Sequence, residues 1–153
     1  MNAQRIMLVL VGAALATVMG IRGATAHCQV PCGIYDDPAR IAQMKEDART
    51  IAKAVTNINQ LSGKHDSQAF NQAARWVATK EAHASHIITT ISEYFLTQKV
   101  KPAAAGAEGR AKYLETLARC HAVMVAAMKT KQSSSAEAAQ ALDAAVEALG
   151  ASW

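Results

Sequence analysis

Residues 41–58, IAQMKEDARTIAKAVTNI, decide the fold, because their apolar side chains recur at alternating spacings of three and four residues. The apolar positions are Ile41, Met44, Ala48, Ile51, Val55 and Ile58. This spacing places them on one face of an α-helix. Asp37 is a suitable N-cap with Pro38 as the first helical residue, and Gly63 can take a left-handed cap. A first helix is therefore predicted between these signals.

The same helical period continues beyond Gly63. A second helix is predicted from about Asp66-Ser67 to just before Lys101-Pro102. Its expected buried face comprises Phe70, Ala74, Val77, Ala84, Ile87, Ile88, Ile91 and Phe95. Residues 102–109 are rich in alanine and glycine and are predicted to form a loop.

Two shorter helices complete the predicted body. The third spans about 111–129, and the side expected to be apolar carries Leu114, Leu117, His121, Val125 and Met128. Ser134 and Glu137 have capping-box spacing, and they open a last helix that closes at Gly150. Four helices with short connections predict an all-α, up-down four-helix bundle over residues 37–150.

Composition excludes several classes of function. The 153 residues carry 16 Lys and Arg against 12 Asp and Glu, and the formal charge of +4 is spread along the chain without a basic block. That distribution lacks the electrostatic footprint of a nucleic-acid-binding protein. The chain contains no Gly-rich phosphate loop, no GxSxG elbow and no HExxH motif.

Residues 1–26 have the features of a cleaved secretory signal peptide. Arg5 precedes an uncharged apolar run, Ile6–Gly20, which is shorter than the ~20 residues of a membrane span. Ala24-Thr25-Ala26 is an A-x-A cleavage site. We therefore expect signal peptidase or a maturation protease to release a periplasmic or secreted domain, residues 27–153, without stable membrane association. The alternatives are an uncleaved anchor and a cytoplasmic pro-segment.

The stretch HCQVPCGIY, residues 27–35, concentrates metal-binding chemistry. Cleavage after Ala26 would leave His27 with a free α-amine beside an imidazole and the thiols of Cys28 and Cys32. Nitrogen and sulfur donors select a thiophilic transition metal over calcium or magnesium. The motif His27-Cys28-x-x-Pro31-Cys32-Gly33-x-Tyr35 resembles the nickel hook of the nickel-containing superoxide dismutases, and the resemblance continues through Asn71–Glu81 and Glu93-Tyr94-Phe95.

This resemblance implies a function, a metal and an assembly. The expected enzyme converts superoxide to dioxygen and hydrogen peroxide by cycling Ni(II) and Ni(III) at the N-terminal hook, with one nickel per subunit of a homo-hexamer. The α-amine of His27, the backbone nitrogen of Cys28 and the two thiolates of Cys28 and Cys32 form a square-planar donor set suited to Ni(II) or Cu(II). The His27 imidazole can approach axially.

Other residues around the hook have supporting roles by the same resemblance. Tyr35 is expected beside the vacant axial face, where its hydroxyl orders water or screens anions. The family steadies the histidine with an acid and an arginine, whereas this chain has Ala42-Gln43 and His83 in the corresponding regions. His83 and Glu81 are the candidate partners of His27, and Tyr94 is a candidate contributed by a neighbouring subunit.

Alternatives to a nickel enzyme remain open from the residues alone. Cys28 and Cys32 of an exported protein can form a disulfide instead. The hook can also belong to an exported carrier that binds nickel or copper without turnover. Zinc would need a fourth side-chain ligand. His83 and His86 have a spacing that could bind metal, although a polar helix stripe is the favoured interpretation, and Cys120 and His121 are expected to be packing residues.

Overall fold

Four helical rods make up residues 37–153, the part of the chain that the computed structural model describes. They are α2 (Asp37–Leu61), α3 (Ser67–Thr89) continued by the π-helix η1 (Thr90–Lys99), α4 (Arg110–Gln132) and α5 (Ala136–Gly150). No strand occurs among these residues. The all-α bundle predicted from the sequence is therefore confirmed, while the hook lies outside the described residues.

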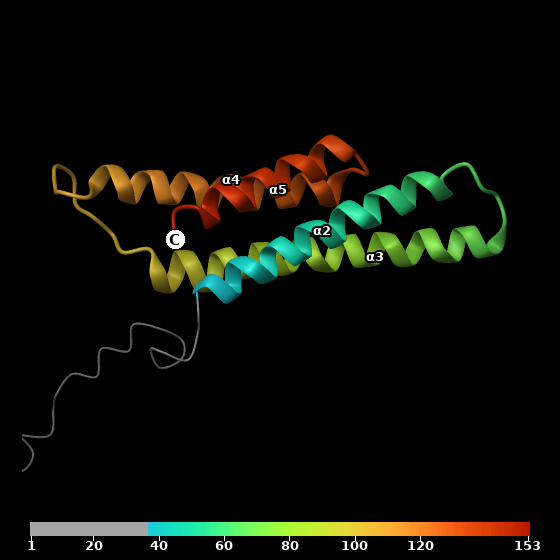
Figure 1. Cartoon of the computed structure of the whole chain (residues 1–153), viewed down its shortest axis with the longest axis horizontal. Coiled ribbons are helices and arrows are strands. Elements are labelled where there is room, and N and C mark those ends of the chain that lie inside the picture. The colour runs from blue at the N-terminus through green and yellow to red at the C-terminus, as the bar shows by residue number, and fades with distance from the viewer. Residues whose placement is uncertain (1–36) are drawn as a thin grey trace, which may run out of the picture. The chain divides into compact units, whose positions relative to one another are not determined.

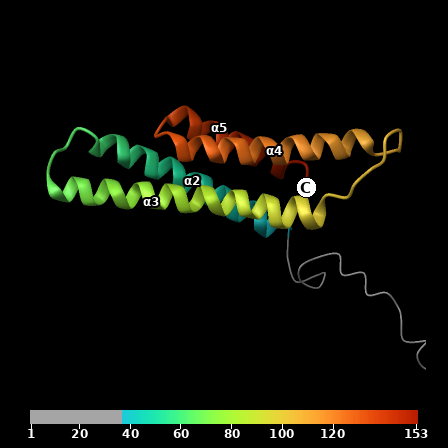
Figure 2. The same cartoon turned by 180° about the vertical axis from the view of Figure 1, so that it is seen from behind.

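The rods alternate in direction and pack in a closed ring. Figure 1 shows α2 and α3 as one antiparallel pair and α4 and α5 as another, and Figure 2 shows the same arrangement from behind. Helix α2 contacts both α3 and α5, and α4 contacts the same two helices. Every helix thus has two neighbours, as in an up-down four-helix bundle.

The core consists of side chains that all four rods direct inward. The largest fully buried apolar side chains are Phe95, Met44, Ile51, Ile87, Ile91, Leu142, Leu149, Val123 and Val146. Burial of such side chains contributes about 1.5–3 kcal/mol each relative to leaving them in water. The Phe95 ring also meets the Trp153 ring edge-on at a centroid distance of 4.9 Å, so the C-terminus is held against η1.

Helix starts follow local capping chemistry, with one correction. Asp66 caps α3, because its carboxylate accepts a hydrogen bond of 2.8 Å from the backbone N–H of Ala69. For α5 the cap is Ser135, whose hydroxyl accepts from the N–H of Ala138 at 3.1 Å. The capping-box spacing pointed to Ser134, so the prediction for this helix start was wrong by one residue.

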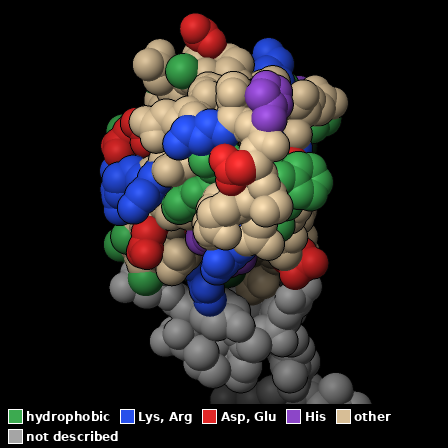
Figure 3. All heavy atoms as spheres, turned by 90° about the vertical axis from the view of Figure 1, so that its right-hand side faces the viewer, with side chains coloured by type: hydrophobic (Ala, Val, Ile, Leu, Met, Phe, Trp, Pro, Cys, Tyr) green, Lys and Arg blue, Asp and Glu red, His purple; other side chains and the backbone are tan. Residues whose placement is uncertain are grey.

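The first part of α3 is more exposed than its pattern predicted. Phe70 is 78% exposed and Val77 is 42% exposed. The reason is that α3 begins beyond the end of α4. The end of α4 meets α3 only at Lys80, whose ammonium donates to the carbonyls of Thr130 and Lys131. Figure 1 shows the α2–α3 hairpin extending past the α4–α5 connection. Figure 3 looks onto this end, where basic, acidic and hydrophobic side chains are interspersed.

Helix α4 buries the face opposite to the one predicted. Its buried residues are Cys120, Val123, Ala126, Ala127 and Thr130. Leu114 and Met128, which were expected to face the core, are 48% and 43% exposed. Small side chains allow α4 to approach its neighbours closely, so packing distance prevails over side-chain hydrophobicity at this position in the bundle.

Two glycines shape the loop between η1 and α4. Gly106 and Gly109 have φ angles of 78° and 85°, which favour glycine. Gly63 does not have a positive φ, so the left-handed cap expected after α2 is absent. Among the described residues no helix combines the length and hydropathy needed to cross a membrane.

Candidate functional site

The predicted nickel ligands precede the described residues. His27, Cys28 and Cys32, together with Tyr35, fall outside residues 37–153, so their coordination stays a prediction. Within residues 37–153, no group of three or more His, Cys, Asp and Glu side chains could hold a metal ion. The described part of the site is therefore the helical end into which the hook leads along the chain.

The start of α2 is fastened to η1 by polar contacts. The carboxylate of Asp37 accepts a hydrogen bond from the Tyr94 hydroxyl and forms an ion pair of 2.9 Å with the Lys99 ammonium. The Arg40 guanidinium lies 5.6 Å from the centre of the Tyr94 ring. Tyr94 is only 6% exposed, so these charges hold a buried phenol in a fixed orientation. Asp37, expected as the N-cap, is instead the first residue of α2.

Tyr94 lies in a helical segment of unusual geometry. The backbone N–H of Val100 donates to the carbonyl of Phe95 at 2.8 Å, and the Thr97 hydroxyl donates to the carbonyl of Ser92 at 2.6 Å. Both bonds span five residues, the spacing of a π-helix. Such segments are rare and are frequent at functional sites. The wider turn directs both Tyr94 and Phe95 inward, with their rings edge-on at 5.1 Å.

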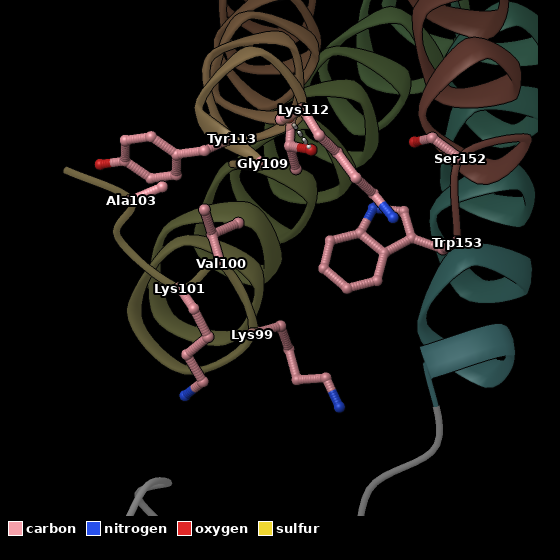
Figure 4. Close-up of a pocket in the computed structure, with 10 residues that line it drawn as sticks. Lys99, Val100, Lys101, Ala103, Gly109, Lys112, Tyr113, Ser152 and Trp153 are labelled. Carbon is pink, nitrogen blue, oxygen red and sulfur yellow. Dashed lines mark hydrogen bonds between the residues drawn. The ribbon is translucent and has the colours of Figure 1, made fainter. Parts of the chain in front are cut away.

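A cationic cavity of about 390 Å³ lies at the same end of the bundle. Its lining includes three lysines, Lys99, Lys101 and Lys112, together with Tyr113 and Trp153, and contains no acidic residue. Figure 4 shows the Lys112 side chain running toward the Trp153 indole, while the ammonium groups of Lys99 and Lys101 point away from it. Lys99 is paired with Asp37, so Lys101 and Lys112 carry the positive charge of this cavity that is unpaired among the described residues.

The two candidate partners of the His27 imidazole are bonded elsewhere within the chain. Glu81 accepts from Lys80 at 3.1 Å and pairs with Lys131 at 3.7 Å. The Nδ1 atom of His83 lies 2.6 Å from a carboxylate oxygen of Asp47, which leaves Nε2 as the free nitrogen of that ring.

Asp47 is a residue that the sequence interpretation missed. It is 1% exposed in the middle of α2, and its second oxygen lies 2.6 Å from Nδ1 of His86. One buried carboxylate thus joins two imidazoles of α3. The signal was present in the sequence, because Asp47 falls three residues after Met44 and four before Ile51, on the apolar face. A charged residue at such a position requires a partner.

Cys120 is not equipped to bind metal. It is a free and fully buried thiol on α4. Burial raises the pKa of Cys120 to about 11, so the thiol keeps its proton at neutral pH. Because the thiolate is the form that binds metal, the structure supports the expectation that Cys120 is a packing residue.

Comparison with known proteins gives one match. A family model described as nickel-containing superoxide dismutase matches residues 22–153, a span that includes both the hook and the whole helical bundle. No match was found among curated proteins, and none among solved structures.

Proposed function

Because the chain belongs to the nickel-containing superoxide dismutase family, we propose that residues 27–35 hold the nickel at which this enzyme dismutates superoxide. The protein is an oxidoreductase that acts on superoxide and contains nickel. The family match, which runs through the hook, is the observation that carries the proposal.

The donor chemistry of the hook fits nickel. Once the chain is cut after Ala26, the His27 amine, the Cys28 backbone nitrogen and the thiolates of Cys28 and Cys32 provide two nitrogens and two sulfurs. Soft anionic donors of this kind suit a late transition metal. Nickel bound there supplies a one-electron Ni(II)/Ni(III) couple that lies between the oxidation and the reduction of superoxide. The His27 imidazole would be a further ligand of the nickel.

The residues of the chain have separate tasks in the reaction. Two superoxide anions and two protons give one dioxygen and one hydrogen peroxide, so one anion loses an electron and the other gains it with the protons. Tyr35 orders water and screens competing anions near the metal. Pro31 restricts the backbone between the two cysteines, because its ring fixes φ.

Positive charge at the end of the bundle favours an anionic substrate. Lys99, Lys101 and Lys112 line one cavity at the end where α2 begins, and the hook leads directly into α2 along the chain. Clustered charge of one sign raises the local concentration of an oppositely charged substrate. Because Lys99 is paired with Asp37, we infer that Lys101 and Lys112, which form no ion pair among residues 37–153, assist the approach of superoxide.

Maturation and assembly complete the proposal. Signal peptidase exposes His27 during export to the periplasm or the medium, and the mature chains form a homo-hexamer with one nickel per subunit. The A-x-A site at 24–26 and the apolar run before it support the cleavage and the export. The family resemblance alone supports the homo-hexamer and its one nickel per subunit. If the chain stays in the cytoplasm, a maturation protease makes the same cut.

Thiol substitutions test the location of the nickel. We expect Cys28→Ser and Cys32→Ser to lose superoxide consumption and one nickel ion per chain relative to the wild type, while the helices remain folded by circular dichroism. Cys120→Ala is the matched control, because it removes a buried thiol that has no part in the hook. Nickel content is measured by elemental analysis of the purified protein.

The outcomes separate the candidate functions. A nickel content in Cys28→Ser equal to that of the wild-type chain would refute the hook as the metal site. Nickel bound by the wild-type chain without superoxide consumption would indicate a metal carrier. Two hook thiols that resist alkylation until a reductant is added, in protein without metal, would indicate a Cys28–Cys32 disulfide.

A further inference from the structure

We propose that His83 and His86 form a second metal site on the surface of α3, made without hook residues, for one divalent ion of the nickel, copper and zinc group. The two imidazoles are three residues apart on one helix, so they occupy the same face one turn apart. Imidazole is a preferred ligand of these three ions. The site would be completed by water, since no third protein ligand is present there among residues 37–153.

A shared carboxylate prepares both rings for this role. The two oxygens of Asp47 each lie 2.6 Å from Nδ1 of one histidine. A carboxylate only accepts hydrogen bonds, so each Nδ1 donates its proton to Asp47. In a neutral ring this fixes the tautomer and leaves the lone pair on Nε2. Metal-binding histidines almost always donate their other nitrogen to such a partner.

The carboxylate of the proposed metal site is buried, and its two imidazoles are partly exposed. The Asp47 side chain is 2% exposed, whereas the side chains of His83 and His86 are 35% and 47% exposed. The orienting group is therefore held inside the bundle between α2 and α3, and the two imidazoles are partly exposed to solvent. Each oxygen of the buried Asp47 carboxylate has one imidazole as its partner.

The test removes the hook chemistry and keeps the whole mature chain. In a His27→Ala, Cys28→Ser, Cys32→Ser background, zinc chloride is titrated into ¹⁵N-labelled protein and imidazole nitrogens are followed by NMR. We expect the Nε2 resonances of His83 and His86 to move together and to saturate at one ion per chain. Isothermal titration with nickel chloride gives the affinity.

Matched variants decide between a built site and scattered surface histidines. In the same background, His83→Gln with His86→Gln abolishes saturable binding, whereas His65→Gln with His121→Gln, two exposed histidines outside the cluster, leaves it intact. No saturable binding in the background protein, or equal loss in both double variants, would overturn the proposal.

The role of the Asp47 carboxylate is tested by measuring metal affinity in a variant that lacks it. We expect Asp47→Asn to weaken metal affinity about 10- to 100-fold while both histidines remain. Unchanged affinity would show that Asp47 does not orient the ligands. If Asp47→Asn fails to fold, the exposed histidine variants still decide whether the site exists. The hook proposal is unaffected by either result, because these proteins lack the hook donors.

Discussion

At the scale of single residues, Lys80 joins α3 to the end of α4. Its ammonium donates to the carbonyl of Thr130, to the carbonyl of Lys131 at 2.9 Å and to Glu81 at 3.1 Å, and its side chain is only 4% exposed. The last carbonyls of a helix have no partner within the helix itself. This lysine therefore satisfies groups that would otherwise be left unpaired in the interior.

We expect Lys80→Met to lower the free energy of unfolding by about 1–3 kcal/mol, because buried carbonyls lose their donor while the aliphatic stem is retained. Urea denaturation followed by circular dichroism measures the change. Lys53→Met, at an exposed position of α2, should change stability by no more than about 0.5 kcal/mol. Equal midpoints for the two variants would show that the Lys80 contacts contribute nothing.

Cys120 should make stability depend on alkaline pH. Its thiol has a pKa of about 11 in the folded chain, raised by burial from the ordinary value of 9.0. As the pH rises, the unfolded chain loses this proton first, so stability falls between about pH 9 and 11. The two-unit difference corresponds to roughly 2–3 kcal/mol at most.

Comparing the wild-type chain with Cys120→Ala isolates this contribution, since all other titrating groups are shared. We expect the wild-type advantage in unfolding free energy to shrink steadily as the pH is raised from 8 toward 10.5 under reducing conditions. A constant difference across that range would mean that the folded thiol titrates normally.

At the scale of elements, the start of α5 is capped by Ser135 and not by its neighbour Ser134. Ser135 accepts from the N–H of Ala138 at 3.1 Å, and its hydroxyl donates to Glu137 at 2.6 Å, which lowers the pKa of that carboxyl. We expect Ser135→Ala to cost about 1 kcal/mol of stability. Ser134→Ala is the control and should be close to neutral. Thermal unfolding measures the melting temperature of both variants. If Ser134 were the true cap, Ser134→Ala would have the lower melting temperature of the two.

Element boundaries and the arrangement of helices could be predicted from the sequence, since apolar spacing and turn residues are local signals. The buried faces of α3 and α4 could not be predicted from the sequence. Phe70 and Val77 are exposed because α4 ends beside Lys80, and helix lengths are matched only in three dimensions. In α4, Ala126 and Ala127 face the core in place of Leu114 and Met128, because close helix approach requires small side chains.

The sequence predicts candidate site residues only where their chemistry is local, and the hook ligands stay a prediction. The donors at 27–35 stand together in the sequence, and the family match covers them. The pairing of Asp47 with His83 and His86 joins residues more than thirty positions apart, and only the packing of α2 on α3 brings them together. The π-helical turn at Tyr94 likewise has no local sequence signature.

At the scale of the whole molecule, the bundle and the hook have different roles. The helices provide a packed bundle with lysines lining a cavity at one end, and the nickel ligands that we propose all precede that bundle in the chain. Activity then depends on a processing event as much as on folding. A folded bundle with an uncut leader should be stable and inactive, because the amine of His27 would be part of a peptide bond.

Superoxide consumption by two chains that differ by one residue tests this account most directly. One chain begins at His27 and the other retains Ala26, and both are incubated with the same nickel concentration and purified to the same folded state. We expect rapid superoxide consumption only in the chain that begins at His27, which should also hold one more nickel ion per chain than the chain that retains Ala26. Equal activity in the two chains would contradict the account, because the retained alanine removes the amine on which the proposed coordination depends.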